Sequence, residues 1–390
     1  MKIVDLVEQF VASLRNVLDS DQGPYGLHEP VFRGREWGYV KDCLDRRWVS
    51  SVGGYVDQFE DRLAALAKTP GAVATVNGTA ALHTSLLLAG VSPGDEILLP
   101  ALTFVGTANA VVYCGAVPHF VDSEEVSLGV DVDKLSEYLC NITEWENKKL
   151  INRLTGRRIR ALIVVHVFGH PVAMQEIHAL CQEYGIKLIE DAAQALGSYY
   201  KGHHAGTLSD VAVLSFNGNK ILTTGGGGAI LSQDTLLLER ARKLTTTART
   251  IIDGEFCHEE VGYNYRMPNI NAALGCAQLE QLNEYLSVKR RLAEAYADAF
   301  RPVDGVRFLL EPDYAKSNYW LNAVIVATSH RAMRSVLVQE AESAGFQCRP
   351  AWRLLHRLPM YADCPRMDLS CAEELQPRII NIPSSATLLK

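Results

Sequence analysis

The chain has 390 residues, of which 48% are hydrophobic and 21% are charged, and its formal net charge is -7. This length allows two domains around a large core, and the acidic balance gives the surface no general basic field for nucleic acid or an anionic membrane. The nine cysteines are an odd number without a CxxC pair, which favours neither a disulfide framework nor a thiolate metal site. We therefore expect a cytoplasmic protein without a metal, a nucleic acid partner or a membrane.

The N-terminal segment has a helical pattern. Apolar residues from Ile3 to Leu14 recur at three- and four-residue spacing, which is typical of an amphipathic helix with acids rather than of a signal peptide. Gly23-Pro24 and the stretch 50–54 interrupt this pattern. No apolar run approaches the ~20 residues that cross a bilayer. We expect a helical extension over residues 1–50.

Strands and helices alternate from there to about residue 235. The expected strands are apolar at consecutive rather than alternate positions, which indicates a mostly parallel sheet with helices on both faces. They are 72–76, 96–99, 119–121, 161–166, 187–190, 211–215 and 229–231. One helix is expected over 58–67, and others begin near Thr79, Thr107, Met174 and Asp234.

A long amphipathic pattern over 269–300 leads into a second region of the chain. Strands near 306–310 and 319–327, a helix over 330–345 and a Pro-rich tail follow. The sequence thus predicts an α/β protein in three parts: an N-terminal helical extension over 1–50, a large domain over 51–268 and a smaller C-terminal α+β domain over 269–390.

An acid and a lysine follow two successive buried strands. Asp191 ends the strand 187–190, where a carboxylate needs a partner, and Ser215 and Lys220 flank a turn after the strand 211–215. A pyridoxal phosphate site uses a lysine that forms a Schiff base and an acid that faces the pyridinium nitrogen. The order of these groups therefore indicates such a site. Taken alone, Asp191 also suits a helix cap, and Lys220 suits a solvated surface turn.

Two further segments suit the same cofactor. Asn77-Gly78-Thr79 joins a strand to a helix N-terminus, where free N–H groups and the helix dipole bind anions. Phe104 stands beyond the strand 96–99, at the strand end where such sheets bind ligands. In addition to these two segments, Gln194 follows Asp191 closely, and its side-chain amide can reach a ring hydroxyl. The competing interpretations are a plain capped turn for Gly78 and a core position for Phe104.

His166 and Arg266 are candidate substrate ligands. Arg266 lies in a polar, aromatic loop before the helical pattern at 269, and its guanidinium fork can hold a phosphate or a carboxylate. The alternative is loop packing. His166 ends a strand and can face the site, but no HExxH or other ligand spacing accompanies it, so no metal site is expected.

These segments together resemble the DegT/DnrJ/StrS family of pyridoxal phosphate-dependent sugar aminotransferases. The motifs that carry the resemblance, in family order, are NGTAALH, LPALTFVGTANAV, HVFGHP, IEDAAQALGS, SFNGNKILTTGGGGAIL and GYNYRMPNINAALGCAQL. The resemblance as a whole runs from about Trp48 to the C-terminus. The resemblance implies the fold type I, aspartate aminotransferase-like architecture with a mostly parallel seven-stranded sheet, active as a homodimer with shared sites. Two features depart from the family: Gly226 replaces a frequent Glu, and an additional segment precedes Trp48.

The resemblance also implies a role for each site residue. Lys220 forms the Schiff base and later acts as the general base. The other residues bind the cofactor: Asp191 pairs with the pyridinium nitrogen, Phe104 stacks on the ring, Gln194 meets the ring hydroxyl, Gly78, Thr79 and Ser215 hold the phosphate, and the partner subunit's Asn264 reaches that phosphate.

Three segments resemble the subgroup of this family that is tied to legionaminic acid and bacillosamine-type sugars. They are the N-terminal segment, Arg349-Pro350-Ala351-Trp352 and the stretch 356–361. The implied reaction moves the amino group of L-glutamate to a nucleotide-linked 4-keto-6-deoxy sugar, UDP-linked and N-acetylated, for surface polysaccharide or lipopolysaccharide. Three alternatives stay open. The first is amino transfer at C3 of the sugar. The second is a dehydratase on the same fold, for which the family implies a histidine at the position of Lys220. The third is a non-catalytic regulator, which is expected to lose Lys220 or Asp191 or to gain a DNA-binding segment.

Overall fold

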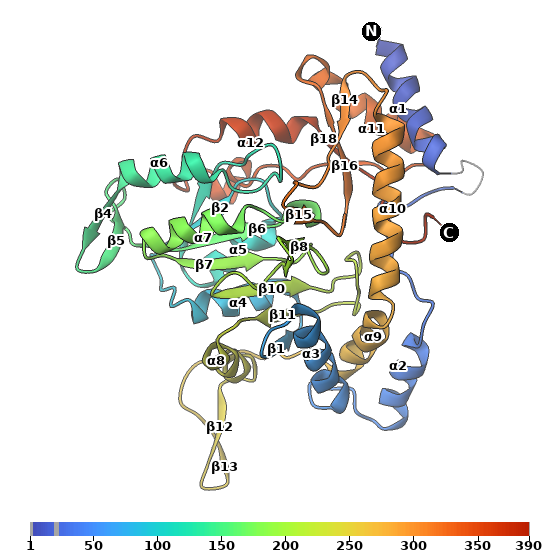
Figure 1. Ribbon diagram of the computed structural model, residues 1–390. Helices are drawn as coiled ribbons and strands as arrows, with labels where there is room; N and C mark the ends of the chain where they lie inside the picture. Colours follow the sequence, from blue (N-terminus) through green and yellow to red (C-terminus); the bar gives the residue numbers. More distant parts are fainter. Residues whose placement is uncertain (1–2, 19–22, 390) are drawn as a thin grey trace.

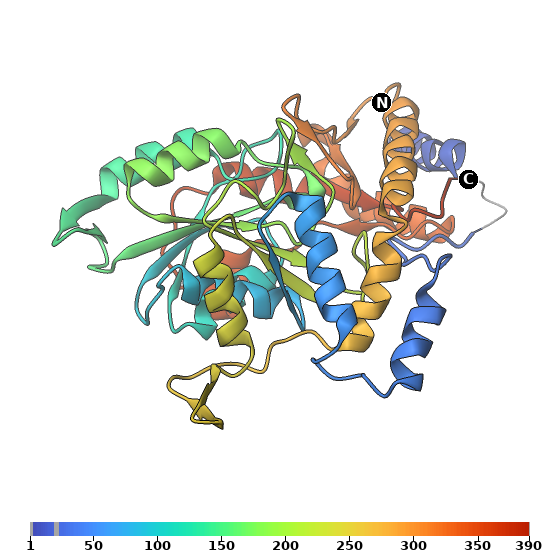
Figure 2. The same ribbon diagram turned by 60° about the horizontal axis from the view of Figure 1, so that its bottom comes forward.

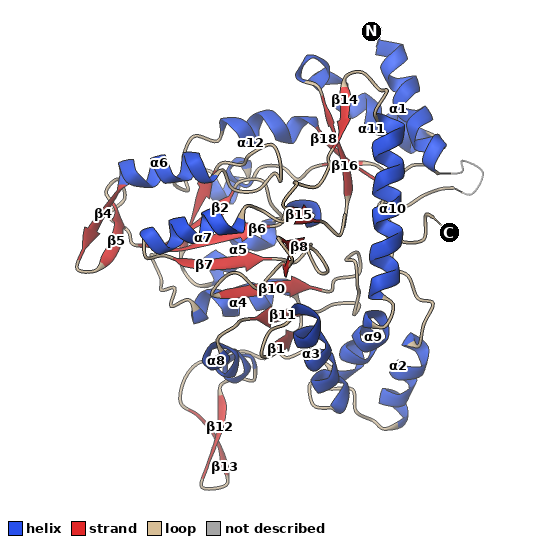
Figure 3. Ribbon diagram, viewed as in Figure 1, coloured by secondary structure: helices blue, strands red, loops and turns tan. Residues whose placement is uncertain are grey.

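The computed structural model describes residues 3–18 and 23–389 (Figure 1). The residues outside the described part are 1–2, 19–22 and 390. Small parts of the segments expected over 1–50 and 269–390 therefore lie outside it as well. Figure 3 shows a central sheet with helices around it and a second, smaller sheet beside the long helix α10 (Leu282–Phe300).

Seven strands form the central sheet. They are β1 (Ala72–Thr75), β2 (Glu96–Pro100), β3 (Val117–Val121), β6 (Ile159–Val165), β7 (Lys187–Asp191), β10 (Val211–Ser215) and β11 (Gly228–Leu231). Their order is β1-β11-β10-β7-β6-β2-β3, and only β11 runs antiparallel to its neighbours. Nearly every strand residue is buried, as a sheet covered on both faces requires. The predicted mostly parallel, seven-stranded sheet is confirmed.

Helices lie on both faces of this sheet. They are α3 (Gly54–Ala67), α4 (Gly78–Leu88), α5 (Val105–Tyr113), α6 (Val132–Ile142), α7 (Met174–Glu183) and α8 (Thr235–Thr245). From β2 to β3 the chain moves toward one edge of the sheet, and from β6 to β7 it moves the other way. Right-handed crossovers therefore place α5 and α7 on opposite faces, as Figure 2 shows. The switch between the two directions creates a crevice at the carboxyl ends of the strands.

The smaller sheet has four strands. They are β14 (Val306–Phe308), β16 (Asn322–Val326), β17 (Arg349–Pro350) and β18 (Ile379–Ile382), in the order β14-β16-β18-β17. The predicted strand 319–327 is shorter than expected. The predicted helix over 330–345 begins with a 3-10 turn, Thr328–Met333, and continues as α11 (Arg334–Ser343). A short helix, α12 (Ser370–Leu375), precedes β18.

The N-terminal segment forms two helices that pack on different parts of the molecule. Helix α1 (Ile3–Val17) lies against α10 and α11, and α2 (Glu36–Asp45) lies against α9 (Asn269–Leu279) (Figure 1). Phe10 of α1 is fully buried, with its ring centroid 5.4 Å from that of Phe300. The first helix therefore completes a hydrophobic core made largely by the last quarter of the chain.

Several elements differ from the sequence predictions. The pattern over 269–300 is divided into α9 and α10. Short strands were also missed: β4 (Thr143–Glu146), β5 (Lys149–Asn152), β8 (Tyr199–Tyr200), β9 (His203–His204), β12 (Arg249–Ile252), β13 (Glu255–His258) and β15 (Ala315–Lys316). The hairpin of β12 and β13 extends away from α8 (Figure 1). Among the described helices, none is long and apolar enough to cross a membrane.

The packing of α1 can be tested at Phe10. Replacing Phe10 with Ala removes a buried ring and leaves a cavity, so we expect the free energy of unfolding to fall by about 3–5 kcal/mol. Gln9→Ala is the matched control, because Gln9 is exposed on the same helix. Urea unfolding followed by circular dichroism measures both. Equal stabilities for the two variants would show that α1 does not contribute to this core.

Candidate active site

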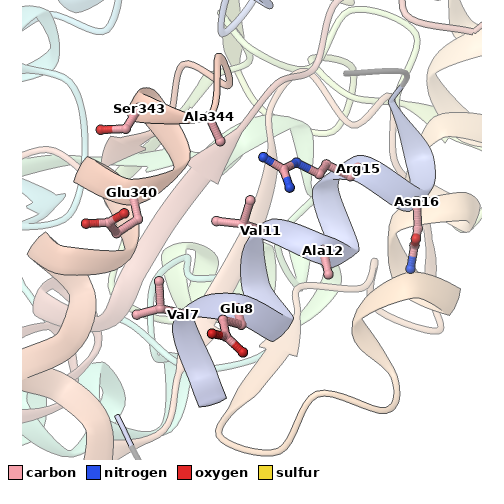
Figure 4. A pocket seen from close by; sticks show the side chains of 9 residues that line it. All are labelled: Val7, Glu8, Val11, Ala12, Arg15, Asn16, Glu340, Ser343 and Ala344. Atoms are coloured by element: carbon pink, nitrogen blue, oxygen red, sulfur yellow. The ribbon is translucent and has the colours of Figure 1, made fainter. Parts of the chain in front are cut away.

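A pocket of about 430 Å³ opens where the carboxyl ends of the central strands meet the smaller sheet's part of the chain. The turns after β1, β2, β7 and β10 form one side of it. The other side comes from Trp320, Arg349 and Trp352. A separate pocket lies between α1 and α11, and Figure 4 shows its lining. That second pocket combines aliphatic side chains with Glu8, Arg15 and Glu340 and includes none of the predicted site residues.

The N-terminus of α4 forms an anion site in the first pocket. The Asn77 side chain caps the helix by accepting a hydrogen bond from the Ala80 N–H, at 2.7 Å. Within the described residues no acceptor faces the N–H groups of Gly78 and Thr79. A Cβ added at Gly78 would lie 3.1 Å from the Ser215 Cβ and 3.3 Å from its hydroxyl oxygen. A side chain at this position would press against Ser215, and Gly78, Thr79 and Ser215 form one cradle of the size and polarity that suit a phosphate.

Asp191 is buried on the wall of this pocket. Its carboxylate accepts hydrogen bonds from the Thr107 hydroxyl, at 2.9 Å, and from the Ala193 N–H, at 3.2 Å. Burial raises the pKa of Asp191 above its ordinary value, although Thr107, Ala193 and Lys220 act to lower it. A cationic N–H group in the pocket would restore the charged form, which is what a pyridinium nitrogen supplies.

Lys220 faces the same pocket. Its Nζ lies 3.9 Å from the ring centroid of Trp320, and the indole N–H of Trp320 donates to the Asn219 carbonyl at 2.6 Å. Burial lowers the pKa of Lys220 to about 8, while the Asp191 charge acts in the opposite direction. Far more of this amine is neutral at pH 7 than of an ordinary lysine, so it is suited to nucleophilic attack and proton transfer.

Gln194 and Phe104 also line the pocket. The Gln194 side-chain oxygen accepts from the Phe168 N–H at 2.8 Å, and in the described part of the chain its amide nitrogen has no partner. That nitrogen is the donor available to a ligand oxygen. The Phe104 side chain is 53% exposed at the start of α5. An uncovered aromatic ring beside a polar cradle suits stacking on a flat ligand.

The structure places His166 and Arg266 outside this pocket. His166 donates from Nε2 to Glu190 at 3.0 Å and accepts from the Val172 N–H at Nδ1. Arg266 pairs with Glu60 and donates to the Ala74 carbonyl at 3.2 Å. Arg266 and His166 thus provide hydrogen bonds to buried carboxylates, which would otherwise carry a large desolvation cost, and neither side chain lines this pocket.

Asn264 is exposed and does not line its own chain's pocket. Its backbone pairs with Thr246, near the base of the hairpin of β12 and β13. This position leaves its side chain free to contact another molecule.

The pocket also includes residues that the sequence analysis did not assign to the site, among them Thr107, Trp320, Arg349 and Trp352. Thr107 carries a local signal, because its hydroxyl stands in the first turn of α5, three residues after Phe104. The other three belong to a distant part of the chain, and no local spacing connects them to Lys220.

The described residues therefore fit one ligand with an anionic group, a flat ring with an N–H, a ring oxygen and a carbonyl carbon that an amine can attack. The sequence profile of the DegT/DnrJ/EryC1/StrS aminotransferase family matches residues 31–390. This chain belongs to that family. The match begins before Trp48, so the similarity extends further toward the N-terminus than the motifs indicated.

Similar proteins agree with this assignment. The chain is 34% identical to GDP-perosamine synthase of Escherichia coli O157:H7 over 93% of each chain. It is 31% identical to UDP-4-amino-4-deoxy-L-arabinose–oxoglutarate aminotransferase of Shewanella sediminis, over 75% of this chain and 74% of the other. The crystal structure of the aminotransferase TlmJ from Streptoalloteichus hindustanus matches with a TM-score of 0.83 and 30% identity, covering 93% and 94%. The chain is a sugar aminotransferase, and its family uses pyridoxal phosphate.

The hydrogen bond from Thr107 to Asp191 predicts a pH effect. Thr107→Val removes the donor without changing the shape of the side chain, so the pKa of Asp191 should rise further. A protonated Asp191 cannot pair with a pyridinium, so both proteins should release the cofactor as the pH falls. Because the pKa of Asp191 is higher in the variant, its release should begin at a higher pH than in the wild type. At neutral pH we expect roughly tenfold weaker binding, the usual cost of losing a hydrogen bond to a charged group.

Fluorescence titration of the cofactor-free protein with pyridoxal phosphate at several pH values measures this effect. Thr245→Val is the control, since its buried hydroxyl donates within α8, away from the pocket. Identical pH dependence in the wild type and Thr107→Val would contradict the role of this hydrogen bond.

Proposed function

We propose that this protein transfers the amino group of L-glutamate to the keto carbon of a nucleotide-linked 4-keto-6-deoxy sugar. The observation that carries the proposal is that Lys220, with a pKa lowered to about 8 by burial, shares one pocket with buried Asp191 and the free N-terminus of α4. We also propose that the sugar is UDP-linked and N-acetylated and that the product enters surface polysaccharide or lipopolysaccharide.

The names of the relatives support parts of this proposal. One relative is named for a 4-amino-4-deoxy sugar and for oxoglutarate, the keto acid that remains when glutamate gives up its amino group. Another is named for a GDP-linked sugar. Position 4 and the glutamate donor therefore have support, while the nucleotide differs among relatives. The UDP link and the N-acetyl group rest on the resemblance of the segments at 1–50 and 349–361 to the legionaminic acid and bacillosamine-type subgroup.

Pyridoxal phosphate, when bound, would supply an electron sink for the charge that develops on the carbon beside the transferred nitrogen. The Nζ of Lys220 would bind the cofactor covalently and, once displaced by the donor, would take up and return a proton as general base. Asp191 would keep the proton on the ring nitrogen. In this proposal, Phe104 covers the ring, Gln194 donates to the ring oxygen, and Gly78, Thr79 and Ser215 hold the phosphate.

We further propose that the active form is a homodimer with shared sites, in which the partner subunit's Asn264 completes the phosphate cradle. The hairpin of β12 and β13 supports this arrangement. Its apolar side chains Ile251 and Phe256 are 69% and 66% exposed, and Val261 beside it is 79% exposed. A second copy of the chain would cover them, as large exposed apolar patches usually require.

The alternatives differ in their support. A dehydratase of this fold is expected to have a histidine at position 220, where this chain has Lys220. A regulator is expected to lose Lys220 or Asp191, and both are present in the pocket. Amino transfer at C3 of the sugar stays open and is decided by the identity of the product.

Lys220→Ala tests the role of the lysine. We expect the variant to fold, to form no covalent link with the cofactor and to lose transamination, because no other lysine lines the described pocket. Borohydride reduction followed by peptide mass spectrometry detects the link, and 2-oxoglutarate release reports the reaction. Lys41→Ala is the control, since Lys41 forms only an exposed pair with Asp45. Appreciable turnover by Lys220→Ala would exclude this assignment.

A panel of UDP-, GDP- and dTDP-linked 4-keto and 3-keto sugars tests the substrate. We expect the highest kcat/KM with the UDP-linked, N-acetylated 4-keto-6-deoxy sugar, and NMR of the product should show the new amine at carbon 4. A preference for another nucleotide would correct only the UDP assignment. An amine at carbon 3 would instead support the C3 alternative.

A further inference from the structure

We propose that the hairpin of β4 and β5, together with the turn that follows it, is a contact surface for an anionic phospholipid bilayer. We call these residues, 143–158, the basic hairpin. None of them lines the active-site pocket, so the proposal does not depend on the amino transfer proposed above. It concerns the surface to which the protein attaches and not the reaction that it performs.

The charge of the basic hairpin is opposite to that of the whole chain. Its cations are Lys148, Lys149, Arg153, Arg157 and Arg158, and its carboxylates are Glu144 and Glu146. The chain as a whole has a formal net charge of -7. A net charge averages over the whole surface, so it excludes a general basic field but not a local one. The expectation of a protein without a membrane was based on that average.

The cations of the basic hairpin are not neutralised by carboxylates of the described chain. Lys148, Lys149, Arg153 and Arg157 are exposed, and Arg153 donates only to the uncharged Asn141 carbonyl. Exposed cations elsewhere do pair, for example Lys41 with Asp45, Arg240 with Glu260 and Arg301 with Asp298. The basic hairpin therefore presents charges that an external anion can meet.

Two large apolar side chains lie among these cations. Trp145 is 58% exposed, and Leu154, which follows Arg153 in the turn after β5, is 75% exposed. Tryptophan and leucine beside lysine and arginine suit a lipid interface, because the apolar groups enter the acyl boundary while the cations meet the headgroups. A soluble polyanion would use the cations and leave Leu154 in water.

The basic hairpin is fixed to the central sheet at its base. The buried carboxylate of Glu96, at the start of β2, accepts from the Asn152 side-chain amide at 2.8 Å and from the Thr155 hydroxyl at 2.6 Å. The Trp145 ring packs over Gly185, where an added Cβ would lie 2.9 Å from a ring carbon. Because these contacts hold the exposed groups in place, binding costs less conformational entropy than the ordering of a flexible segment would.

The position of the basic hairpin leaves it accessible. Both views show it projecting from one end of the molecule, apart from the hairpin of β12 and β13 that the proposed dimer would cover (Figures 1 and 2). A projecting tip can contact a flat bilayer. An acidic protein is the competing partner, but lysine is depleted from protein–protein interfaces, whereas anionic headgroups attract it.

The test is sedimentation of the purified full-length protein with vesicles. One set of vesicles contains phosphatidylcholine alone, and the other contains phosphatidylcholine mixed with phosphatidylglycerol. We expect binding to the second set only. Raising the ionic strength from about 0.1 M to about 1 M shortens the Debye length from roughly 10 Å to roughly 3 Å, so it should release the protein. A wild type that does not bind the phosphatidylglycerol vesicles would overturn the proposal.

The double variant Lys148→Gln/Lys149→Gln removes two exposed cations. A lysine near an anionic bilayer strengthens binding about fivefold, so we expect the dissociation constant for the vesicles to rise about 25-fold. Lys41→Gln/Lys68→Gln is the matched control, because it changes the net charge equally on α2 and at the end of α3, far from the basic hairpin (Figure 1). It should bind as the wild type does. Equal dissociation constants for the two double variants would contradict the proposal.

Leu154→Ser distinguishes a bilayer from a soluble polyanion. We expect this variant to bind the vesicles severalfold more weakly, because an apolar contact with the acyl boundary is lost while every cation is kept. Circular dichroism and amino transfer should match the wild type, which shows that the fold is intact. Vesicle binding that is insensitive to Leu154→Ser, or binding to inorganic polyphosphate without binding to vesicles, would overturn the assignment to a bilayer.

Discussion

Two groups of opposite charge, buried Asp191 and half-buried Lys220, follow neighbouring parallel strands, and their position determines what this site can do. Asp191 ends β7 and pairs in register with Val213 of β10, two residues before Ser215 and seven before Lys220. Removal from water raises the pKa of Asp191 and lowers that of Lys220, so both shifts bring the groups toward neutral pH. A parallel sheet is the element that produces this, because the carboxyl ends of its strands meet at one edge. The same edge receives α4, whose N-terminus adds positive potential without a charged side chain.

The second part of the chain maintains this arrangement from outside the sheet. Asn318 donates to the carbonyls of Gln194 and Leu196, each at 2.9 Å, and the Trp320 indole holds the turn before Lys220. Trp320 is itself fixed by Lys289, a fully buried amine that donates to its carbonyl at 3.1 Å. Burial lowers the pKa of Lys289 well below its ordinary value. The residues beside Asp191 and Lys220 are thus tied to one segment, 318–320.

The sequence predicted the elements that depend on local patterns and missed those that depend on distant partners. All seven central strands were found, because buried parallel strands are apolar at consecutive positions, and the caps Asn77 and Asp234 were close to the predicted helix starts. The contacts of Arg266 with Glu60 and of His166 with Glu190 were not predicted, because no sequence pattern links the members of either pair. Trp320 and Arg349 were missed for the same reason, since the fold brings them to Lys220 across a hundred residues or more. The attachment of α1 to α10 likewise required the three-dimensional structure.

The division of the pocket between two parts of the chain has a consequence for specificity. The groups proposed to contact the cofactor come from the turns of the central sheet, whereas Trp320, Arg349 and Trp352 come from around the smaller one. The cofactor groups are constrained by their mutual distances, because a Cβ at Gly78 alone would already contact Ser215. In the opposite wall, exposed Arg349 and the Trp352 ring have no contact with Asp191 that would constrain them in this way, whereas Trp320 is held by its contacts with Asn219 and Lys220. Such a division predicts that relatives retain the reaction while the wall that faces the substrates varies. Relatives that are about one-third identical to this chain, with names that specify different nucleotides, agree with this prediction.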